Sequence, residues 1–264
     1  MKIHFYKYQA TGNDFVLMDN REEKLAFSTE QIVKICDRKF GIGADGLMLI
    51  EKHADLDFNL VYYNSDGSQS LCGNGSRAAV QFASAIGVVN GKASFNAYDG
   101  LHDATLLSSG VVRLKMNPVR EVKKVGDDFF INTGSPHHVR FVKNIAQYPV
   151  YDEGRTIRYS DAYKPGGTNV NFVELLPDNT IFVRTYERGV EDETLSCGTG
   201  VTAAALAGFF KGYASPITIK TKGGDLSVEF KSGQTGQSAG QADTFQDIYL
   251  IGPAKKVFEG DLEL

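Results

Sequence analysis

Alternating hydrophobic and polar residues predict that most of this chain forms β-strands. The runs are short and rich in aromatic and branched residues, as is typical of half-buried strands. In the first half they cover Ile3–Gln9, Phe15–Asp19, Leu47–Glu51, Phe58–Tyr63 and Ala104–Leu107. In the second half they cover His138–Val142, Asn169–Leu175, Thr180–Tyr186, Ile217–Thr221, Leu226–Phe230 and Asp247–Ile251.

Three segments have apolar residues at helical spacing instead, and they predict helices over Thr29–Arg38, Asn74–Ile86 and Thr199–Phe210. Ser28 or Thr29 would cap the first helix. The other two helices each have a narrow face of small residues, mostly alanine. Such a face suits burial against a curved sheet.

Two motifs occur once in each half of the chain at nearly the same offset. Thr11-Gly-Asn-Asp-Phe-Val recurs in outline as Thr133-Gly-Ser-Pro-His-His, 122 residues later. Cys72-Gly-Asn-Gly recurs as Cys197-Gly-Thr-Gly, 125 residues later, and each copy follows a charged, turn-rich loop and opens an Ala-rich helix. We therefore predict two similar α+β halves.

The predicted boundary lies near Met116–Val119. It gives an N-terminal half, 1–117, that carries Cys72 and a C-terminal half, 118–251, that carries Cys197. The tail, 252–264, could pack with the N-terminal half. The Gly/Ser/Gln-rich stretch Ser232–Asp243 predicts a mobile hairpin loop.

Composition narrows the class of protein. The 264 residues are 42% hydrophobic and 23% charged, as in ordinary globular proteins, and the net charge is −4. That balance predicts no nucleic-acid or membrane partner. No apolar run is long enough for a transmembrane helix, and the first ten residues lack the apolar segment of a signal peptide, so a cytoplasmic location is expected.

The three cysteines, Cys36, Cys72 and Cys197, are odd in number and widely spaced, which argues against a disulfide framework or a structural zinc site. We predict no metal. Cys36 lies on the apolar face of its helix and is expected to be a buried, inert thiol. Cys72 and Cys197 would instead begin helices, where unpaired backbone N–H groups and the helix dipole favour a thiolate.

Two such thiols on opposite sides of one bound molecule suit one chemical task. A thiolate takes a proton from one face of a carbon while a thiol returns a proton to the other face. The helix N-termini would bind the substrate carboxylate and stabilise the enolate-like charge that forms. That scheme needs no cofactor.

The chain resembles the diaminopimelate epimerase family of two-cysteine racemases. The resemblance rests on segments that span the chain: Thr11-Gly-Asn-Asp-Phe, Gly41-Ile-Gly-Ala-Asp-Gly, Tyr63-Asn-Ser-Asp-Gly-Ser, Cys72-Gly-Asn-Gly-Ser-Arg, Thr133-Gly-Ser-Pro-His, Thr168-Asn-Val-Asn-Phe-Val, Tyr186-Glu-Arg-Gly and Cys197-Gly-Thr-Gly. It implies two pseudo-symmetric domains, each a barrel-like, mostly antiparallel sheet wrapped around a central helix. It also implies a possible homodimer and the cofactor-independent interconversion of LL- and meso-2,6-diaminopimelate in lysine biosynthesis.

The resemblance assigns roles to matching residues. Cys72 would be the base toward the LL isomer and Cys197 the opposing acid, with His137 and Glu187 tuning the pair. The substrate would be bound by Asn13, Asn64, Gly73, Asn74, Asn169, Glu187, Arg188, Gly198 and Thr199. Gly46 and Ser135 depart from the family pattern, which has glutamine and asparagine there in some members.

Three alternatives remain open from the residues. A proline or hydroxyproline racemase also uses two cysteines, but it would not need polar residues for a second amino-acid end. A phenazine-biosynthesis-like isomerase shares the fold and usually lacks the cysteine pair. In a redox sensor or binding protein, the same two cysteines would form a switching disulfide.

Overall fold

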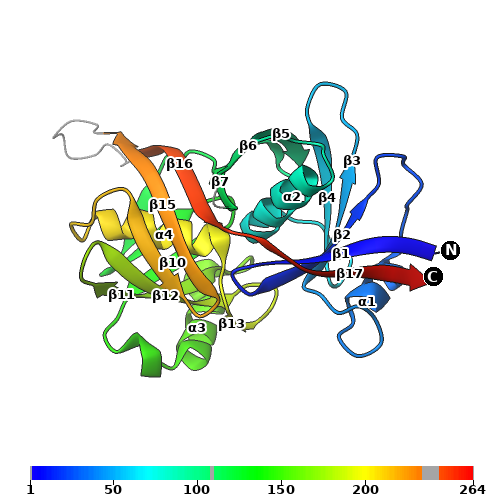
Figure 1. Ribbon diagram of the computed structural model, residues 1–264. Helices are drawn as coiled ribbons and strands as arrows, with labels where there is room; N and C mark the ends of the chain where they lie inside the picture. Colours follow the sequence, from blue (N-terminus) through cyan, green and yellow to red (C-terminus); the bar gives the residue numbers. More distant parts are fainter. Residues whose placement is uncertain (1, 108–109, 234–243, 264) are drawn as a thin grey trace. The chain divides into compact units, whose positions relative to one another are not determined.

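The computed structural model describes residues 2–107, 110–233 and 244–263, and it divides them into two units. One unit comprises Met1–Leu114 and Gly252–Leu264, and the other comprises Lys115–Ile251. Each unit contains β-strands and one Ala-rich helix, labelled α2 and α4 (Figure 1).

Among the described residues of the first unit, eight strands are hydrogen-bonded side by side. In spatial order they are β17 (Lys255–Glu263), β1 (Lys2–Ala10), β2 (Asn13–Asp19), β3 (Gly46–Glu51), β4 (Phe58–Asn64), β5 (Lys92–Ala97), β6 (Gly100–Leu106) and β7 (Val111–Lys115). Neighbours are antiparallel except for the parallel pairs β2–β3 and β4–β5. The C-terminal strand β17 therefore belongs to the same sheet as the N-terminal strand β1.

The sheet of the second unit repeats this order. It contains β8 (Val122–Val125), β9 (Asp128–Asn132), β10 (Pro136–Phe141), β11 (Asn169–Leu176), β12 (Thr180–Glu187), β14 (Ile217–Thr221), β15 (Gly224–Gly233) and β16 (Thr244–Pro253). Again two neighbouring pairs are parallel, β10–β11 and β12–β14. A short strand, β13 (Asp192–Thr194), also pairs with β12.

The Ala-rich helices lie inside these sheets. Helix α2 (Gly73–Ala85) contacts β1, β2, β3, β4, β6 and β17, while α4 (Gly198–Phe209) contacts β9, β10, β11, β12, β14 and β15. Alanines such as Ala78, Ala79, Ala203 and Ala204 have no exposed surface. Small side chains let the strands approach each helix from several sides. The predicted fold class, α+β with barrel-like sheets around central helices, is confirmed.

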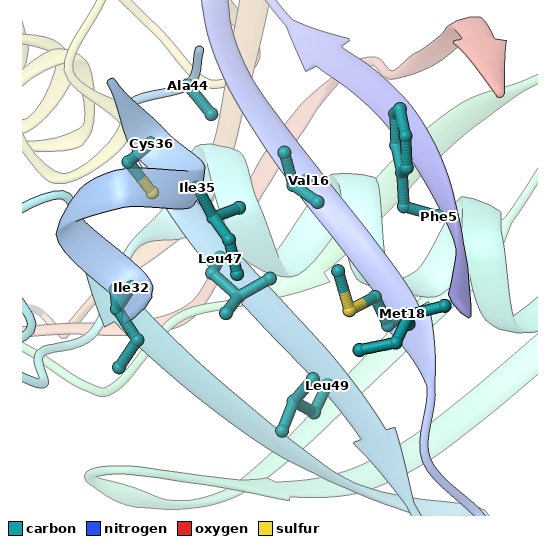
Figure 2. Close-up of a cluster of buried hydrophobic side chains, with 10 residues drawn as sticks. Phe5, Val16, Met18, Ile32, Ile35, Cys36, Ala44, Leu47 and Leu49 are labelled. Carbon is teal, nitrogen blue, oxygen red and sulfur yellow. The ribbon is translucent and has the colours of Figure 1, made fainter. Parts of the chain in front are cut away.

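Two shorter helices cover the outside of the sheets at equivalent places. Helix α1 (Thr29–Cys36) connects β2 to β3, and α3 (Val150–Arg158) connects β10 to β11. One-turn 3₁₀ helices lie at Ile145–Gln147 and Asp161–Tyr163. Figure 2 shows Ile32, Ile35 and Cys36 of α1 beside Leu47 and Val16 of the sheet. The prediction that Cys36 is buried is confirmed, since the residue is 4% exposed.

The structure corrects the predicted bounds of one helix and one loop. Helix α1 ends at Cys36 rather than Arg38, because Asp37 is extended and its carboxylate accepts hydrogen bonds from the N–H groups of Lys39 and Phe40. Of the predicted loop Ser232–Asp243, Ser232 and Gly233 belong to β15, and 234–243 lie outside the described residues. Within the described ranges, each helix is too short or too polar to span a bilayer.

Candidate active site

Cys72 and Cys197 occupy the same structural position in the two units. Each is the residue immediately before its helix, with an extended backbone: φ −130° and ψ 109° at Cys72, φ −122° and ψ 114° at Cys197. Each sulfur therefore lies at the end of a helix where the first N–H groups have no partner inside the helix. The positive end of the helix dipole favours a thiolate there.

The Cys72 sulfur has polar neighbours from its own unit. The Gly75 N–H donates to Sγ at 3.3 Å, and the Asn13 amide oxygen lies 3.5 Å from Sγ. The Asn74 amide donates to that same Asn13 oxygen at 3.4 Å. These contacts bring Asn13, Cys72 and Asn74 together at the start of α2.

A network of charged residues fixes the orientation of Asn13. Its amide nitrogen donates to the carboxylate of Asp45, which also accepts from Arg38 at 2.7 Å. Arg38 in turn binds both carboxylate oxygens of Asp14, at 2.7 and 3.0 Å. Because Asp45 accepts only from the nitrogen side of the Asn13 amide, the oxygen side must face Cys72 and Asn74.

Arg77 is a fully buried cation in the first turns of α2. Its guanidinium donates to the Gly73 carbonyl, the Asn74 side-chain oxygen and the Thr11 hydroxyl at 3.0–3.4 Å, and its Nε has no hydrogen-bond partner among the described residues. Burial lowers the pKa of Arg77 to about 10, while the charge of Cys72 opposes that change. By reciprocity, Arg77 favours the thiolate form of Cys72.

Asn64 has a different local role. Its amide nitrogen donates to the Ser68 carbonyl and hydroxyl at 3.2 and 3.0 Å, and its oxygen accepts from Ser70 at 3.2 Å. These bonds hold the turn that follows β4 and leads to Cys72. The structure thus gives Asn64 a turn-shaping role, and substrate binding by Asn64 stays a prediction.

The Cys197 sulfur is connected to His137 through Thr199. The Thr199 hydroxyl lies 3.5 Å from Sγ and 2.9 Å from Nε2 of His137. The Thr133 hydroxyl donates to the Thr199 carbonyl at 2.8 Å, which ties the repeated Thr-Gly motif to the start of α4. Burial lowers the pKa of His137 to about 3, with the positive charge of Arg188 adding to the effect, so the imidazole is neutral at neutral pH.

Asn169, Glu187 and Arg188 lie where β11 begins and β12 ends, beside His137. The Asn169 amide donates to the Ser135 hydroxyl and the Pro136 carbonyl, both at 2.9 Å, and its oxygen accepts from the Arg188 N–H at 2.9 Å. The Glu187 carboxylate accepts from Thr194 at 2.8 Å. Ser135, which departs from the family pattern, therefore still contributes a hydrogen-bonding side chain.

Glu191 anchors the loop that follows Arg188. Its carboxylate accepts from Arg158 at 3.0 Å, from Tyr159 at 2.8 Å and from the Gly189 N–H at 3.0 Å. The guanidinium of Arg188 donates to the Gly166 carbonyl at 3.3 Å. The loop with Glu187 and Arg188 is therefore held by hydrogen bonds at its centre as well as at its ends.

Each unit therefore gathers its own predicted residues. The first brings Asn13, Cys72, Gly73 and Asn74 to the start of α2. The second brings His137, Asn169, Glu187, Arg188, Cys197, Gly198 and Thr199 to the start of α4 and the adjoining strand ends.

Sequence reasoning missed four residues that hold these groups in place: Asp45, Arg77, Asn171 and Glu191. A signal for two of them was present. Asn169 and Asn171 alternate along a strand of otherwise buried apolar residues, which places two amides on one face. Arg77 is a charged residue within an Ala-rich, buried helix.

The fold of this chain occurs in solved structures of low sequence identity. The chain matches a phenazine biosynthesis protein of the PhzF family from Bacillus anthracis with a TM-score of 0.73 and 12% identity, covering 100% of both chains. It matches a probable proline racemase from Agrobacterium radiobacter with a TM-score of 0.70 and 16% identity, covering 99% of this chain and 93% of that one. The chain thus has the fold that these proteins share.

Sequence comparison narrows the assignment. The model of the diaminopimelate epimerase family matches residues 5–122 and 129–245. The diaminopimelate epimerase of Flavobacterium psychrophilum is 48% identical over 261 residues, which cover 97% of this chain and 99% of that protein. The chain belongs to the diaminopimelate epimerase family, and it is an isomerase of the epimerase class. The resemblance predicted from its motifs is confirmed.

Proposed function

We propose that this protein interconverts LL- and meso-2,6-diaminopimelate without a cofactor, with Cys72 and Cys197 acting on opposite faces of one α-carbon. The observation that carries the proposal is the equivalence of the two cysteines. Each precedes the central helix of its unit with nearly the same backbone angles. The diaminopimelate epimerase of Flavobacterium psychrophilum, 48% identical over 97% of this chain, supports the choice of substrate.

The proposed reaction conserves protons. In the direction from the LL isomer, the Cys72 thiolate takes the α-proton, so a C–H bond breaks and an S–H bond forms. The Cys197 thiol gives its proton to the opposite face of the same carbon and becomes a thiolate. The reverse reaction exchanges the two roles.

Electrostatics at both helix starts suit this exchange. Backbone N–H groups at Gly73, Asn74, Gly198 and Thr199 would bind the α-carboxylate and the negative charge that develops on it. Arg77 places a buried positive charge near Cys72. Cys197 has a neutral hydrogen-bond network instead. The two sulfurs therefore differ in environment, which suits a pair in which one sulfur starts as thiolate and the other as thiol.

The distal end of diaminopimelate carries a second ammonium and a second carboxylate. In the proposal, Asn13, Asn64 and Asn169 contribute amides, Glu187 an acceptor and Arg188 a donor. The hydrogen bonds that fix Asn169 and the Arg188 loop support this assignment, because pre-positioned polar groups bind a polar ligand at lower entropic cost.

The proposed activity is tested by NMR in D₂O with LL-diaminopimelate, meso-diaminopimelate and proline as parallel substrates. We expect the α-proton signal of both diaminopimelate isomers to disappear as deuterium enters, and the proline signal to persist. Exchange of proline at a comparable rate would support a proline racemase instead. A lack of exchange with all three, in a folded protein with reduced thiols, would refute epimerase activity on these substrates.

The setting of the protein is also part of the proposal. We propose a cytoplasmic enzyme that forms a homodimer and has no nucleic-acid or membrane partner. Light scattering coupled to size-exclusion chromatography checks the assembly. A dimer has twice the 28.9 kDa mass of one chain, and a single peak at one chain mass across micromolar concentrations would contradict it.

A further inference from the structure

Asn171 is a buried amide outside the predicted set of site residues, and it lies between His137 and the neighbouring strand. It lies on β11 with no exposed surface, between β10 and β12. Its amide nitrogen lies 3.1 Å from Nδ1 of His137 and donates to the His138 carbonyl at 3.1 Å. Its oxygen accepts from the Thr185 hydroxyl at 2.9 Å.

These contacts fix which way the amide points. A backbone carbonyl only accepts hydrogen bonds, so the group that faces His138 must be the NH₂ of Asn171. One of its two hydrogens goes to that carbonyl, and the other points at Nδ1 of His137. Nδ1 must therefore accept, which means that it carries no proton.

The proton of the neutral His137 ring then lies on Nε2. Burial and the charge of Arg188 keep the ring neutral, so only one ring nitrogen is protonated. Nε2 donates to the Thr199 hydroxyl at 2.9 Å. Because His137 donates in this bond, the hydrogen of the Thr199 hydroxyl is not taken by the ring.

The hydrogen of the Thr199 hydroxyl can then be donated to the Cys197 sulfur when that sulfur is a thiolate. At 3.5 Å from Sγ, the Thr199 hydroxyl can donate to a thiolate or accept from a thiol. In the opposite His137 tautomer, Nε2 would accept the hydroxyl hydrogen, and Thr199 could then only accept from a thiol. The tautomer thus decides whether Thr199 can stabilise the thiolate.

We propose that Asn171 is a positioning residue that holds His137 in the tautomer with the proton on Nε2, and so keeps the Thr199 hydroxyl hydrogen available to Cys197. Its catalytic meaning rests on the proposed function, in which Cys197 must alternate between thiol and thiolate. The hydrogen-bond polarity itself does not depend on the substrate.

Other charged groups near α4 leave this chain of hydrogen bonds undisturbed. From β10, His138 bonds Asp128 of β9 at 3.0 Å. From the end of β12, Glu187 accepts from Thr194. On β11, Glu174 accepts from backbone N–H groups of the loop after β10. The buried residues of β14 and β15 are apolar. Arg188 is the charged residue that acts on His137.

The first test is NMR of the histidine rings in ¹⁵N-labelled protein, with the His137 signals assigned by their loss in His137→Gln. The ¹⁵N shift distinguishes a protonated ring nitrogen from a bare one. We expect Nδ1 bare and Nε2 protonated at pH 7. A bare Nε2, or a doubly protonated ring, would overturn the proposal, and the ring is read in the wild-type protein, with His137→Gln serving only to assign its signals.

The second test measures the rate at which iodoacetamide alkylates Cys197, by peptide mass spectrometry on protein without substrate. Thr199→Val removes the hydroxyl and should slow alkylation at pH 7 about tenfold, which corresponds to about one unit in the thiol pKa. Asn171→Leu removes the hydrogen bond that fixes the His137 tautomer, and it should slow the alkylation of Cys197 severalfold. In the double variant Asn171→Leu/Thr199→Val, the rate should equal that of Thr199→Val alone.

Cys72, followed in the same digests, is the internal control and should not be slowed by either substitution. If Asn171→Leu slows alkylation of Cys197 equally with and without the Thr199 hydroxyl, Asn171 acts through the general fold and the proposal is wrong. Because neither test uses turnover, a failure of the epimerase assignment would leave both results interpretable.

Discussion

Gly200, the third residue of α4, offers a sharp test of how tightly the Cys197 network is packed. A Cβ added at this position would lie 2.3 Å from the side-chain oxygen of Asn171, whereas an ordinary contact is 3.4–4 Å. The Asn171 amide would have to move by about 1 Å. It is held by three hydrogen bonds of 2.9–3.1 Å, so a shift of that size breaks or strains all of them.

The cost of Gly200→Ala follows from these contacts. Three buried hydrogen bonds contribute about 1 kcal/mol each, and overpacking adds about 1–3 kcal/mol. Alanine recovers about 1 kcal/mol relative to glycine in a helix. We therefore expect Gly200→Ala to lower the free energy of unfolding by about 3–5 kcal/mol.

Gly75, at the equivalent position of α2, gives a matched control. Its added Cβ would lie 2.1 Å from Cε of Met48, the flexible end of a side chain. A methionine can adopt another rotamer, so we expect Gly75→Ala to cost about 1 kcal/mol or less. Both substitutions place the new methyl 3.3 Å from Cβ of the preceding cysteine, so that contact is the same in the two variants.

Urea unfolding followed by circular dichroism measures both effects, and hydrogen exchange resolved by peptide locates them in one unit or the other. Gly200→Ala should lose exchange protection in β10, β11 and α4. Equal destabilisation by the two substitutions, or a Gly200→Ala protein within 0.5 kcal/mol of wild type, would show that the Asn171 amide is not held as described.

Three further predictions concern other parts of the chain. Cys36→Ala should leave turnover within about twofold, because Cys36 packs in the core and burial raises its thiol pKa to about 11; a tenfold loss in a folded variant would contradict this. Burial of Asp14 opposes ionisation, but hydrogen bonds from Arg38 and Lys7 lower the pKa of its carboxyl group to about 2. The contribution of Asp14 to stability is therefore present above about pH 4 and is lost as the pH falls toward 2. In Asp14→Asn, the free energy of unfolding measured in urea should change less between pH 4 and pH 2 than in the wild type. An equal change in both proteins would refute the attribution to Asp14. Arg188→Ala should lower kcat/KM for diaminopimelate about 10- to 100-fold while sparing binding of a one-ended amino acid, and equal effects on both would show that Arg188 does not grip the distal end.

Periodicity and repetition predicted the parts of the fold that depend on local pattern. The two central helices begin and end within one residue of their predicted bounds, and the strand over Ile217–Thr221 matches β14. All three segments have a clear period, and the two helices also have glycine-rich starts, so local and tertiary preferences agree.

Helix α3 was missed because tertiary contacts override its local pattern. Its sequence contains Gly154 in mid-helix, which argues against a helix. The glycine is there because a Cβ would lie 2.4 Å from Tyr186, so the helix packs closely on the sheet. The remaining helical signals of α3 extend over only nine residues: Val150 and Ile157 are buried on one face, and acidic residues in the first turn precede basic residues in the last.

Strand β17 was missed for a related reason. Its residues, Lys255–Glu263, are mostly exposed and charged, without the alternation of a half-buried strand. Pairing with β1 makes it a strand, and that pairing joins segments about 250 residues apart, as in Lys2 with Glu263. Long-range pairing of this kind cannot be read from a local window.

The residues of the candidate site also fall into those that local sequence predicts and those that depend on tertiary contacts. Helix-start cysteines and their glycines are visible as motifs, because a motif specifies a backbone conformation. The partners that set hydrogen-bond polarity, such as Asn171 for His137 and Asp45 for Asn13, depend on side-chain directions across neighbouring strands. Only the folded structure shows those directions.

The two-base mechanism is tested most directly by following the first turnovers of LL-diaminopimelate in D₂O by NMR and mass spectrometry. With one thiol on each face, the earliest meso product should carry deuterium at the inverted carbon, while the remaining LL substrate stays protonated. Cys72→Ala and Cys197→Ala should each abolish this conversion. Deuterium appearing in recovered LL substrate as fast as in product, or full conversion by either single variant, would contradict the mechanism.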